Sequence, residues 1–196
     1  MYYFFKAELV YWKDELVEAL VLDEPPREYT RKWWYGENLS LGSYEFSFSI
    51  DDQAPLLDNY RTADIFDLYS EKLISILSRA NVKYELFPAK IISKINGEIL
   101  NLDYKVFRLT EINDCLDENR STFKVLPSGK RKGEFKALQQ PSFTDTFLKS
   151  GKLLTRIAGY EKVVIIHEDL KRIIEDENIS GCKFSERRLD ESVLFE

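Results

Sequence analysis

Residues 70–87 read SEKLISILSRANVKYELF and residues 167–184 read HEDLKRIIEDENISGCKF, and these are the two most informative stretches for the fold class. They align at a constant offset of 97 residues, with a polar residue first, apolar residues at helix-face spacing and a phenylalanine last. Ser70 and His167 occupy N-cap positions, where Ser is favoured and His is less common. Each stretch therefore predicts a short amphipathic helix followed by a return strand. A true internal duplication and two ordinary helices with a shared pattern are both compatible with the alignment.

The segments around these helices predict strands. Val163–Ile166 is a continuous apolar run, which is typical of a strand covered on both faces. Tyr44–Ile50 alternates apolar and polar side chains, the period-two pattern of a strand with one buried face. Asn96-Gly97 and Pro127–Gly133 separate further apolar runs and predict the turns of two hairpins. The expected fold class is α+β (mixed α/β): a mostly antiparallel or mixed sheet with short helices packed on it.

The composition favours one folded unit. The chain has 196 residues, of which 44% are hydrophobic and 32% charged, so we expect a single domain over residues 1–196. Cys115 and Cys182 lie far apart without metal-ligand spacing and are expected to be free buried thiols. The first residues lack the features of an export signal, and no apolar run approaches the ~20 residues of a membrane span. We therefore expect a cytoplasmic protein that does not bind membranes.

The net charge of −6 is concentrated in the first half of the chain. Residues 1–100 hold 11 Lys and Arg against 17 Asp and Glu, whereas residues 101–196 hold 17 of each. An acidic surface repels phosphate backbones and attracts cationic proteins. We therefore expect a basic protein partner and no nucleic acid, and we interpret Lys130–Lys132 as a solvated loop tip.

Residue patterns for catalysis are weak. The single histidine, His167, is explained as a helix cap, and no protease motif surrounds either cysteine. No phosphate-binding loop or dinucleotide motif occurs, and we expect no cofactor, no metal and no catalytic residue. The alternative is a small metal-dependent hydrolase or nuclease, whose carboxylates would have to converge in one pocket. Its candidate ligands are Asp51, Asp52, Asp58, Asp64 and Asp67.

The aromatic cluster Trp33-Trp34-Tyr35 is a candidate binding anchor. Adjacent residues of a strand or helix point in different directions, so one of the two tryptophans is a candidate for exposure. Burial between two layers also explains the pair. Trp and Tyr dominate interface hot spots, and acidic side chains complement a basic partner. The candidate partner-binding residues are Trp33, Trp34, Tyr35, Asp51, Asp52 and Asp58.

Three groups of segments match the motifs of a known family. Leu68–Leu77 and Val82–Pro88 resemble its SE-x-L helix and F-x-P strand. Tyr104–Leu109 and Cys115–Ser121 resemble its Y-x-V-x-N and LD-x-x-x-S segments. Leu153–Ile157, Val163–Leu170 and Ile179–Phe184 resemble its terminal FR, V-S-E-x-L and GV-x-F segments. The family is that of bacterial immunity proteins that accompany polymorphic toxins in contact-dependent competition, and the resemblance covers about residues 60–190.

The resemblance implies a protein that binds a cognate toxin and blocks it by steric occlusion, without catalysis. The matched positions are mostly apolar, cap and turn residues, so they imply a shared fold and carry over no catalytic site. Residues 61–196 then form the shared part, and residues 1–60 form a variable aromatic and acidic part where we expect partner specificity. A scaffold that self-associates through an apolar patch is a further alternative, and the sequence leaves the oligomeric state open.

Overall fold

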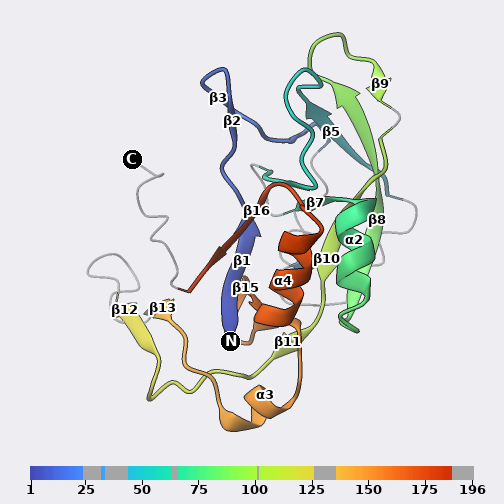
Figure 1. Cartoon of the computed structure of the whole chain (residues 1–196). Coiled ribbons are helices and arrows are strands. Elements are labelled where there is room, and N and C mark those ends of the chain that lie inside the picture. The colour runs from blue at the N-terminus through green and yellow to red at the C-terminus, as the bar shows by residue number, and fades with distance from the viewer. Residues whose placement is uncertain (24–31, 34–43, 63–65, 101, 126–135, 187–196) are drawn as a thin grey trace.

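The computed structural model describes residues 1–23, 32–33, 44–62, 66–100, 102–125 and 136–186 (Figure 1). The predicted fold class is confirmed, because short helices pack on antiparallel and mixed sheets. Within these residues one sheet has five strands and another has seven, and two separate two-stranded hairpins accompany them. None of the described helices has both the length and the apolar character needed to cross a membrane.

The first sheet brings the start of the chain next to its C-terminal segments. Its order is β11 (Ile112–Asn113), β14 (Leu154–Ile157), β15 (Tyr160–His167), β1 (Tyr2–Ala7) and β16 (Cys182–Ser185). β11 and β14 are parallel, and the other neighbours are antiparallel. The strand predicted at Val163–Ile166 lies in β15, where Ile165 and Ile166 are buried in different core clusters. Burial on both faces explains this apolar run.

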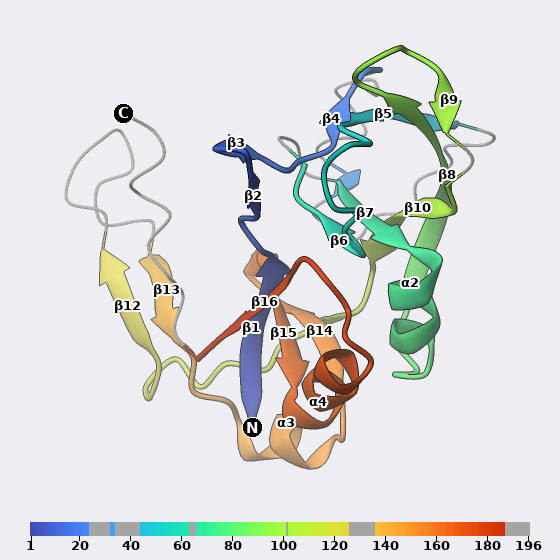
Figure 2. The ribbon, with the colours of Figure 1, turned by 45° about the horizontal axis from the view of Figure 1, so that its top comes forward.

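The second sheet curls strongly (Figure 2). Its order is β4 (Leu20–Val21), β5 (Phe46–Ile50), β8 (Tyr84–Ser93), β10 (Tyr104–Leu109), β7 (Asp67–Ser70) and β6 (Asn59–Tyr60), with β9 (Ile99–Leu100) on β8. The first half of β8 pairs with β10 and its second half pairs with β5, so the sheet turns within this strand. The strand predicted at 44–50 and the Asn96-Gly97 hairpin are both confirmed, and Gly97 has a φ of +74°.

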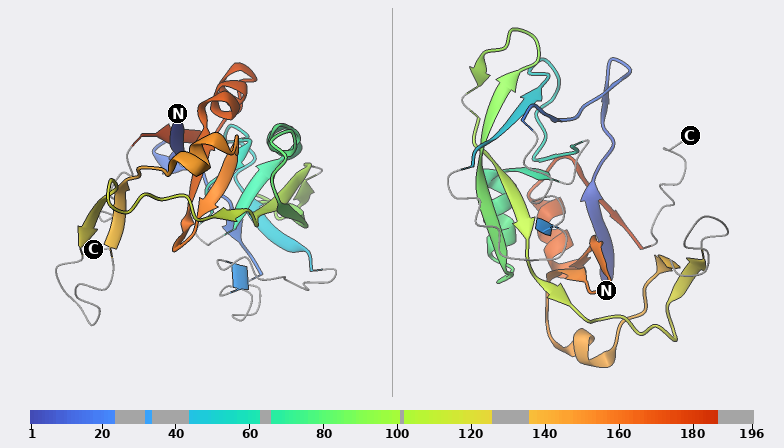
Figure 3. Two further views of the ribbon diagram at one scale, coloured as in Figure 1. Left: turned by 90° about the horizontal axis from the view of Figure 1, so that it is seen from below. Right: turned by 180° about the vertical axis from the view of Figure 1, so that it is seen from behind.

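The two small hairpins lie outside these sheets. β2 (Tyr11–Trp12) pairs with β3 (Glu15–Leu16), directly after β1. β12 (Thr122–Val125) pairs with β13 (Lys136–Gln140) at the side of the first sheet (Figure 3). This pairing confirms the second predicted hairpin. Its connecting loop, including Lys130–Lys132, lies outside the described residues.

The two predicted helix-then-strand units are equivalent in the structure. β7, α2 (Glu71–Ser78) and β8 form one unit, with β10 between its two strands. β15, α4 (Glu168–Asp176) and β16 form the other, with β1 between its two strands. Ser70 and His167 cap the helices as predicted, and each helix is followed by an asparagine with positive φ, Asn81 or Asn178. Residues that align at an offset of 97 in the sequence therefore occupy equivalent places in the two units.

The terminal phenylalanines of the two units are the exception. In both units the cap residue lies opposite a tyrosine of the central strand, so the two units begin in the same strand register. Phe87 lies opposite Val106 of β10, two residues beyond the tyrosine that pairs with the cap. Phe184 lies opposite Phe5 of β1, three residues beyond the corresponding tyrosine, so the strand register differs by one residue between the units. A one-residue shift in register turns a side chain to the other face of a sheet. Phe87 consequently packs in the core of the second sheet and Phe184 against the helices, so the predicted equivalence of these residues was wrong.

The helices α2 and α4 pack side by side and join the two units (Figure 1). Leu73 and Leu77 of α2 share one buried cluster with Leu170 and Ile174 of α4. Strands of both sheets contribute to this cluster as well. The short helix α3 (Asp145–Lys149) covers a separate cluster through Phe147.

Candidate partner-binding surface

Trp33 belongs to the core. Its side chain is 3% exposed and contacts the rings of Phe46, Phe66 and Phe87. A partner anchor must be accessible, so Trp33 cannot serve as one, and burial, which the sequence left open, accounts for it. Trp34 and Tyr35 lie outside the described residues.

Two buried arginines beside Trp33 connect the sheets. Arg108 of β10 donates from Nε to the Trp33 carbonyl at 3.3 Å and from Nη1 to Glu85 at 2.6 Å. Arg156 of β14, in the other sheet, donates from Nη1 to the same carbonyl at 3.3 Å. Burial and the neighbouring Arg108 guanidinium lower the pKa of Arg156 to about 10. These contacts hold β10 and β14 in a fixed relation, which is a structural role.

Asp67 of β7 lies in the same region, and its ionisation gives a pH-dependent prediction. Burial raises the pKa of its carboxyl group from 3.8 to about 7, although Arg156 acts in the opposite direction. A raised folded-state pKa stabilises the protein below the unfolded pKa, and this contribution is lost as the pH rises through the folded pKa. Wild-type stability should therefore fall relative to that of the Asp67→Asn variant as the pH rises from about 4 to 7, by at most about 1.4 kcal/mol per pH unit.

Urea unfolding of both proteins at pH 5 and pH 8 measures this difference. Other titrating groups are common to the two proteins and cancel in the comparison. Parallel stability profiles for wild type and Asp67→Asn would contradict the raised pKa of Asp67.

Asp58 joins the two equivalent helix-then-strand units. Its Oδ2 accepts hydrogen bonds from the backbone N–H and the Oγ of Ser180, each at 2.9 Å, and its Oδ1 accepts from Ser70 Oγ at 2.7 Å. Ser70 caps α2, and Ser180 lies in the loop after α4. We call this set the Asp58 clasp. Both carboxylate oxygens are engaged within the chain, so Asp58 has a structural explanation in place of the predicted partner contact.

The other predicted carboxylates do not converge. Asp52 accepts from Ser93 Oγ at 2.7 Å, and Asp51 accepts from the backbone N–H of Gln53 at 2.9 Å. Asp64 lies outside the described residues. Across the described ranges, no group of three or more His, Cys, Asp or Glu side chains is placed to hold a metal. The residues that the hydrolase alternative requires therefore occupy separate places in this part of the chain.

The β2–β3 hairpin presents two aromatic side chains to solvent. Tyr11 is 63% exposed and Trp12 is 38% exposed. The turn residues Lys13 and Asp14 have φ values of 49° and 67°, the left-handed conformation that a type I′ turn requires and that glycine or asparagine usually supplies. Tyrosine and tryptophan offer a large contact area with few rotatable bonds. The hairpin therefore has the character of an anchor for another protein.

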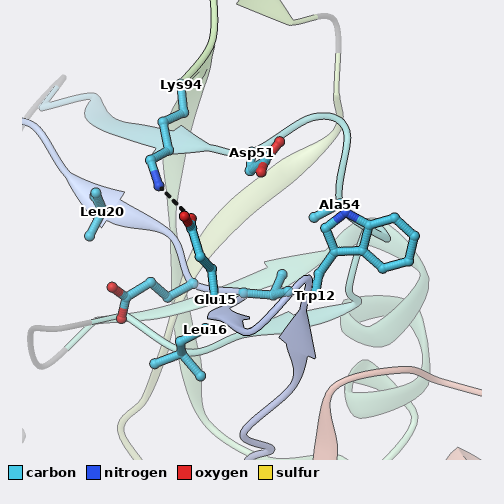
Figure 4. A pocket seen from close by; sticks show the side chains of 9 residues that line it. Trp12, Glu15, Leu16, Leu20, Asp51, Ala54 and Lys94 are labelled. Carbon is cyan, nitrogen blue, oxygen red and sulfur yellow. Dashed lines mark ion pairs between the residues drawn. The ribbon is translucent and has the colours of Figure 1, made fainter.

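A small pocket of about 40 Å³ lies between this hairpin and the second sheet (Figure 4). The hairpin and the residues after it contribute Trp12, Glu15 and Glu18, the loop after β5 contributes Asp51 and Ala54, and the turn after β8 contributes Lys94. Ala54 lies beside the Trp12 ring, while Asp51 and Lys94 lie on the side where Glu15 points (Figure 4). We call these six residues the Trp12 pocket.

Carboxylates outnumber amines in the Trp12 pocket. Lys94 Nζ lies 3.6 Å from a carboxylate oxygen of Glu15, and both side chains are largely exposed. Glu18 and Asp51 form no ion pair with another described residue. Outside the pocket, Lys13 Nζ lies 5.7 Å from the centre of the Trp12 ring. The lining of the Trp12 pocket therefore carries an excess of negative charge, which suits a cationic partner.

Sequence reasoning predicted Asp51 in this surface but missed Tyr11 and Trp12. Strands of two residues are too short to show period-two alternation, and the Lys13-Asp14 turn lacks the glycine that usually marks a hairpin. The available signal was a pair of large aromatic residues directly before a charged dipeptide in an acidic stretch.

The sequence matches no family model, and no curated protein is significantly similar to it. The resemblance to immunity proteins therefore stays a prediction.

Proposed function

We propose that this chain is an immunity protein that binds a basic protein toxin and blocks it sterically, in the cytoplasm of the cell that makes both proteins. The observation that carries the proposal is the exposure of Tyr11 and Trp12 on a hairpin beside the uncompensated carboxylates Glu18 and Asp51. An inhibitor of this kind needs a complementary surface with a few anchors and no reacting groups. The proposal therefore includes no catalysis, metal or cofactor.

The surroundings of the hairpin support a protein partner over a small ligand. The segments that line the Trp12 pocket also carry exposed apolar residues, Leu56 in the loop after β5 and Ile95 in the β8–β9 turn. A small molecule usually binds in a cavity of several hundred Å³, far larger than the Trp12 pocket. Aromatic and aliphatic side chains with an acidic surround match the apolar centre and polar rim of a protein interface.

The protein encoded next to this chain in its genome tests the proposal. We expect its expression to arrest growth of a host cell, and co-expression of this chain to restore growth. The two purified proteins should form a stable complex in gel filtration. A neighbouring protein that is not toxic, or a toxin that neither binds this chain nor is silenced by it, would contradict the proposed function.

A further inference from the structure

Three polar side chains converge beside β11, at the edge of the first sheet. Glu111 Oε1 lies 2.8 Å from Lys152 Nζ and accepts a hydrogen bond from Asn113 Nδ2 at 3.3 Å. An amine and a side-chain amide therefore meet at one carboxylate oxygen. We infer that Lys152 and Asn113 form an isopeptide bond within the chain, with Glu111 as the proton carrier. The chain reacts once with itself and turns over no substrate, so this inference stands apart from the proposed function.

The fold holds the three groups together. Glu111 directly precedes β11 and Asn113 ends it, and side chains two positions apart on a strand point to the same face. β11 pairs with β14, and Lys152 lies just before β14. Asn113 Nδ2 also donates to Thr155 Oγ1 of β14 at 2.8 Å, and the Lys152 carbonyl accepts from Tyr2 Oη at 2.7 Å. Groups that are positioned before they react need little further loss of entropy to join.

Glu111 is suited to carry a proton. Its side chain is 9% exposed, and its second oxygen, Oε2, is buried and makes no hydrogen bond with a described residue. A buried oxygen without a donor disfavours the ionised carboxylate, so Oε2 is the atom that takes up the proton. Burial acts to raise the pKa of Glu111, but hydrogen bonds from Lys152 and Asn113 lower it overall. The resting pair is therefore charged, and the proton has to move from Nζ to the carboxylate before the amine reacts.

The reaction balances within these three groups. The Lys152 ammonium gives one proton to Glu111, and the freed lone pair of Nζ attacks Asn113 Cγ. As the Cγ–Nζ bond forms and the Cγ–Nδ2 bond breaks, Glu111 gives its proton to Nδ2 and takes a second one from Nζ. The departing ammonia removes that proton and leaves as ammonium, so the carboxylate is regenerated. Lys152 is 36% exposed, which gives the ammonium a route to solvent.

The bond links β11 to the segment before β14. It closes the intervening chain, which carries the β12–β13 hairpin and α3, into a covalent loop. Closing a long loop stabilises a protein by restricting its unfolded chain. We therefore expect the linked wild-type protein to unfold at a higher urea concentration than the Lys152→Arg variant.

Intact-protein mass spectrometry of the full chain tests the inference. After prolonged incubation of the folded protein, we expect a mass lower than that of the sequence by one ammonia molecule. A digest should contain a branched peptide that joins Asn113 to Lys152. Lys152→Arg keeps a positive charge beside Glu111 but removes the attacking amine, and Glu111→Gln removes the proton carrier. Both variants should keep the full mass.

Lys149→Arg is the matched control. Lys149 is an exposed residue of α3, three positions before Lys152, and this variant should lose ammonia as the wild type does. An unchanged wild-type mass, or a loss that persists in Lys152→Arg or in folded Glu111→Gln, would overturn the inference. If Glu111→Gln does not fold, Lys152→Arg and the branched peptide decide the result between them.

Discussion

Gly181→Ala is expected to lower the free energy of unfolding by about 3 kcal/mol or more. Gly181 has a φ of +74°, and a Cβ atom built on it would lie 2.3 Å from the carbonyl oxygen of Asn59. That contact is with backbone, and it cannot be relieved by rotating a side chain. The Asn59 backbone is also held by its own hydrogen bond to the carbonyl of Ser180 at 3.2 Å and by pairing with β7. Chemical denaturation of the variant measures the loss.

Gly159→Ala is the matched control. Gly159 has nearly the same φ, +78°, but its added Cβ would meet no atom within 4 Å. The strain of a left-handed alanine alone is about 1–2 kcal/mol, so the difference between the two variants reports the close approach at Gly181. Equal losses for the two variants would contradict the tight contact between the loop after α4 and residues 57–59.

The loop that contains Gly181 helps to hold the two equivalent units together. The Asp58 clasp lies in the same place, since Asp58 binds Ser180 from one unit and Ser70 from the other. A bulkier residue at Gly181 would separate this loop from β6 and break the clasp. The loss of stability should therefore be cooperative, affecting both sheets together.

Trp12→Ala is expected to weaken the complex with the toxin by about 2 kcal/mol or more, mainly through faster dissociation. Trp12 is partly exposed on a hairpin whose turn fixes its position, so its removal deletes the central apolar contact without opening the core. Surface plasmon resonance with the purified toxin gives both rate constants. Thermal unfolding should show that the variant remains folded.

Leu148→Ala provides the comparison for Trp12. Leu148 is also an exposed apolar residue, but it lies on α3, at the opposite end of the molecule from the β2–β3 hairpin (Figure 1). Its truncation should change the affinity by less than about 0.5 kcal/mol. If Leu148→Ala weakens the complex and Trp12→Ala does not, the interface lies on the other end of the molecule.

The sequence predicted the local elements well because their signals are local. Helix caps at Ser70 and His167, the apolar run of β15 and the Asn96-Gly97 turn all depend on residues within about ten positions of each other. The insertion of β1 between β15 and β16 depends on residues more than 150 positions away and left no local pattern. The clustering of Arg108 and Arg156 at the Trp33 carbonyl is equally non-local.

The candidate surface was only partly predictable for a different reason. The acid excess directed attention to the first half of the chain, and Asp51, one of the residues chosen there, lines the pocket beside the β2–β3 hairpin. Composition cannot show which acids hold the fold together, so Asp52 and Asp58, which accept hydrogen bonds from Ser93 and Ser180, were assigned to the partner. Trp33 was chosen because it stands beside another tryptophan, although its neighbours in space are the phenylalanines of the core.

The association rate of the toxin with this chain, measured across salt concentration, tests whether a basic toxin docks on the surface around the β2–β3 hairpin. At low salt, Glu18→Lys with Asp51→Lys should slow association about tenfold or more, and the difference from wild type should shrink as salt screens the charges. Asp114→Lys with Glu118→Lys makes the same change in net charge on two exposed residues between β11 and β12, and it should have a much smaller effect. Equal association rates for wild type and the pocket variant at low salt, with the variant still folded, would contradict the claim that a basic toxin docks on this surface.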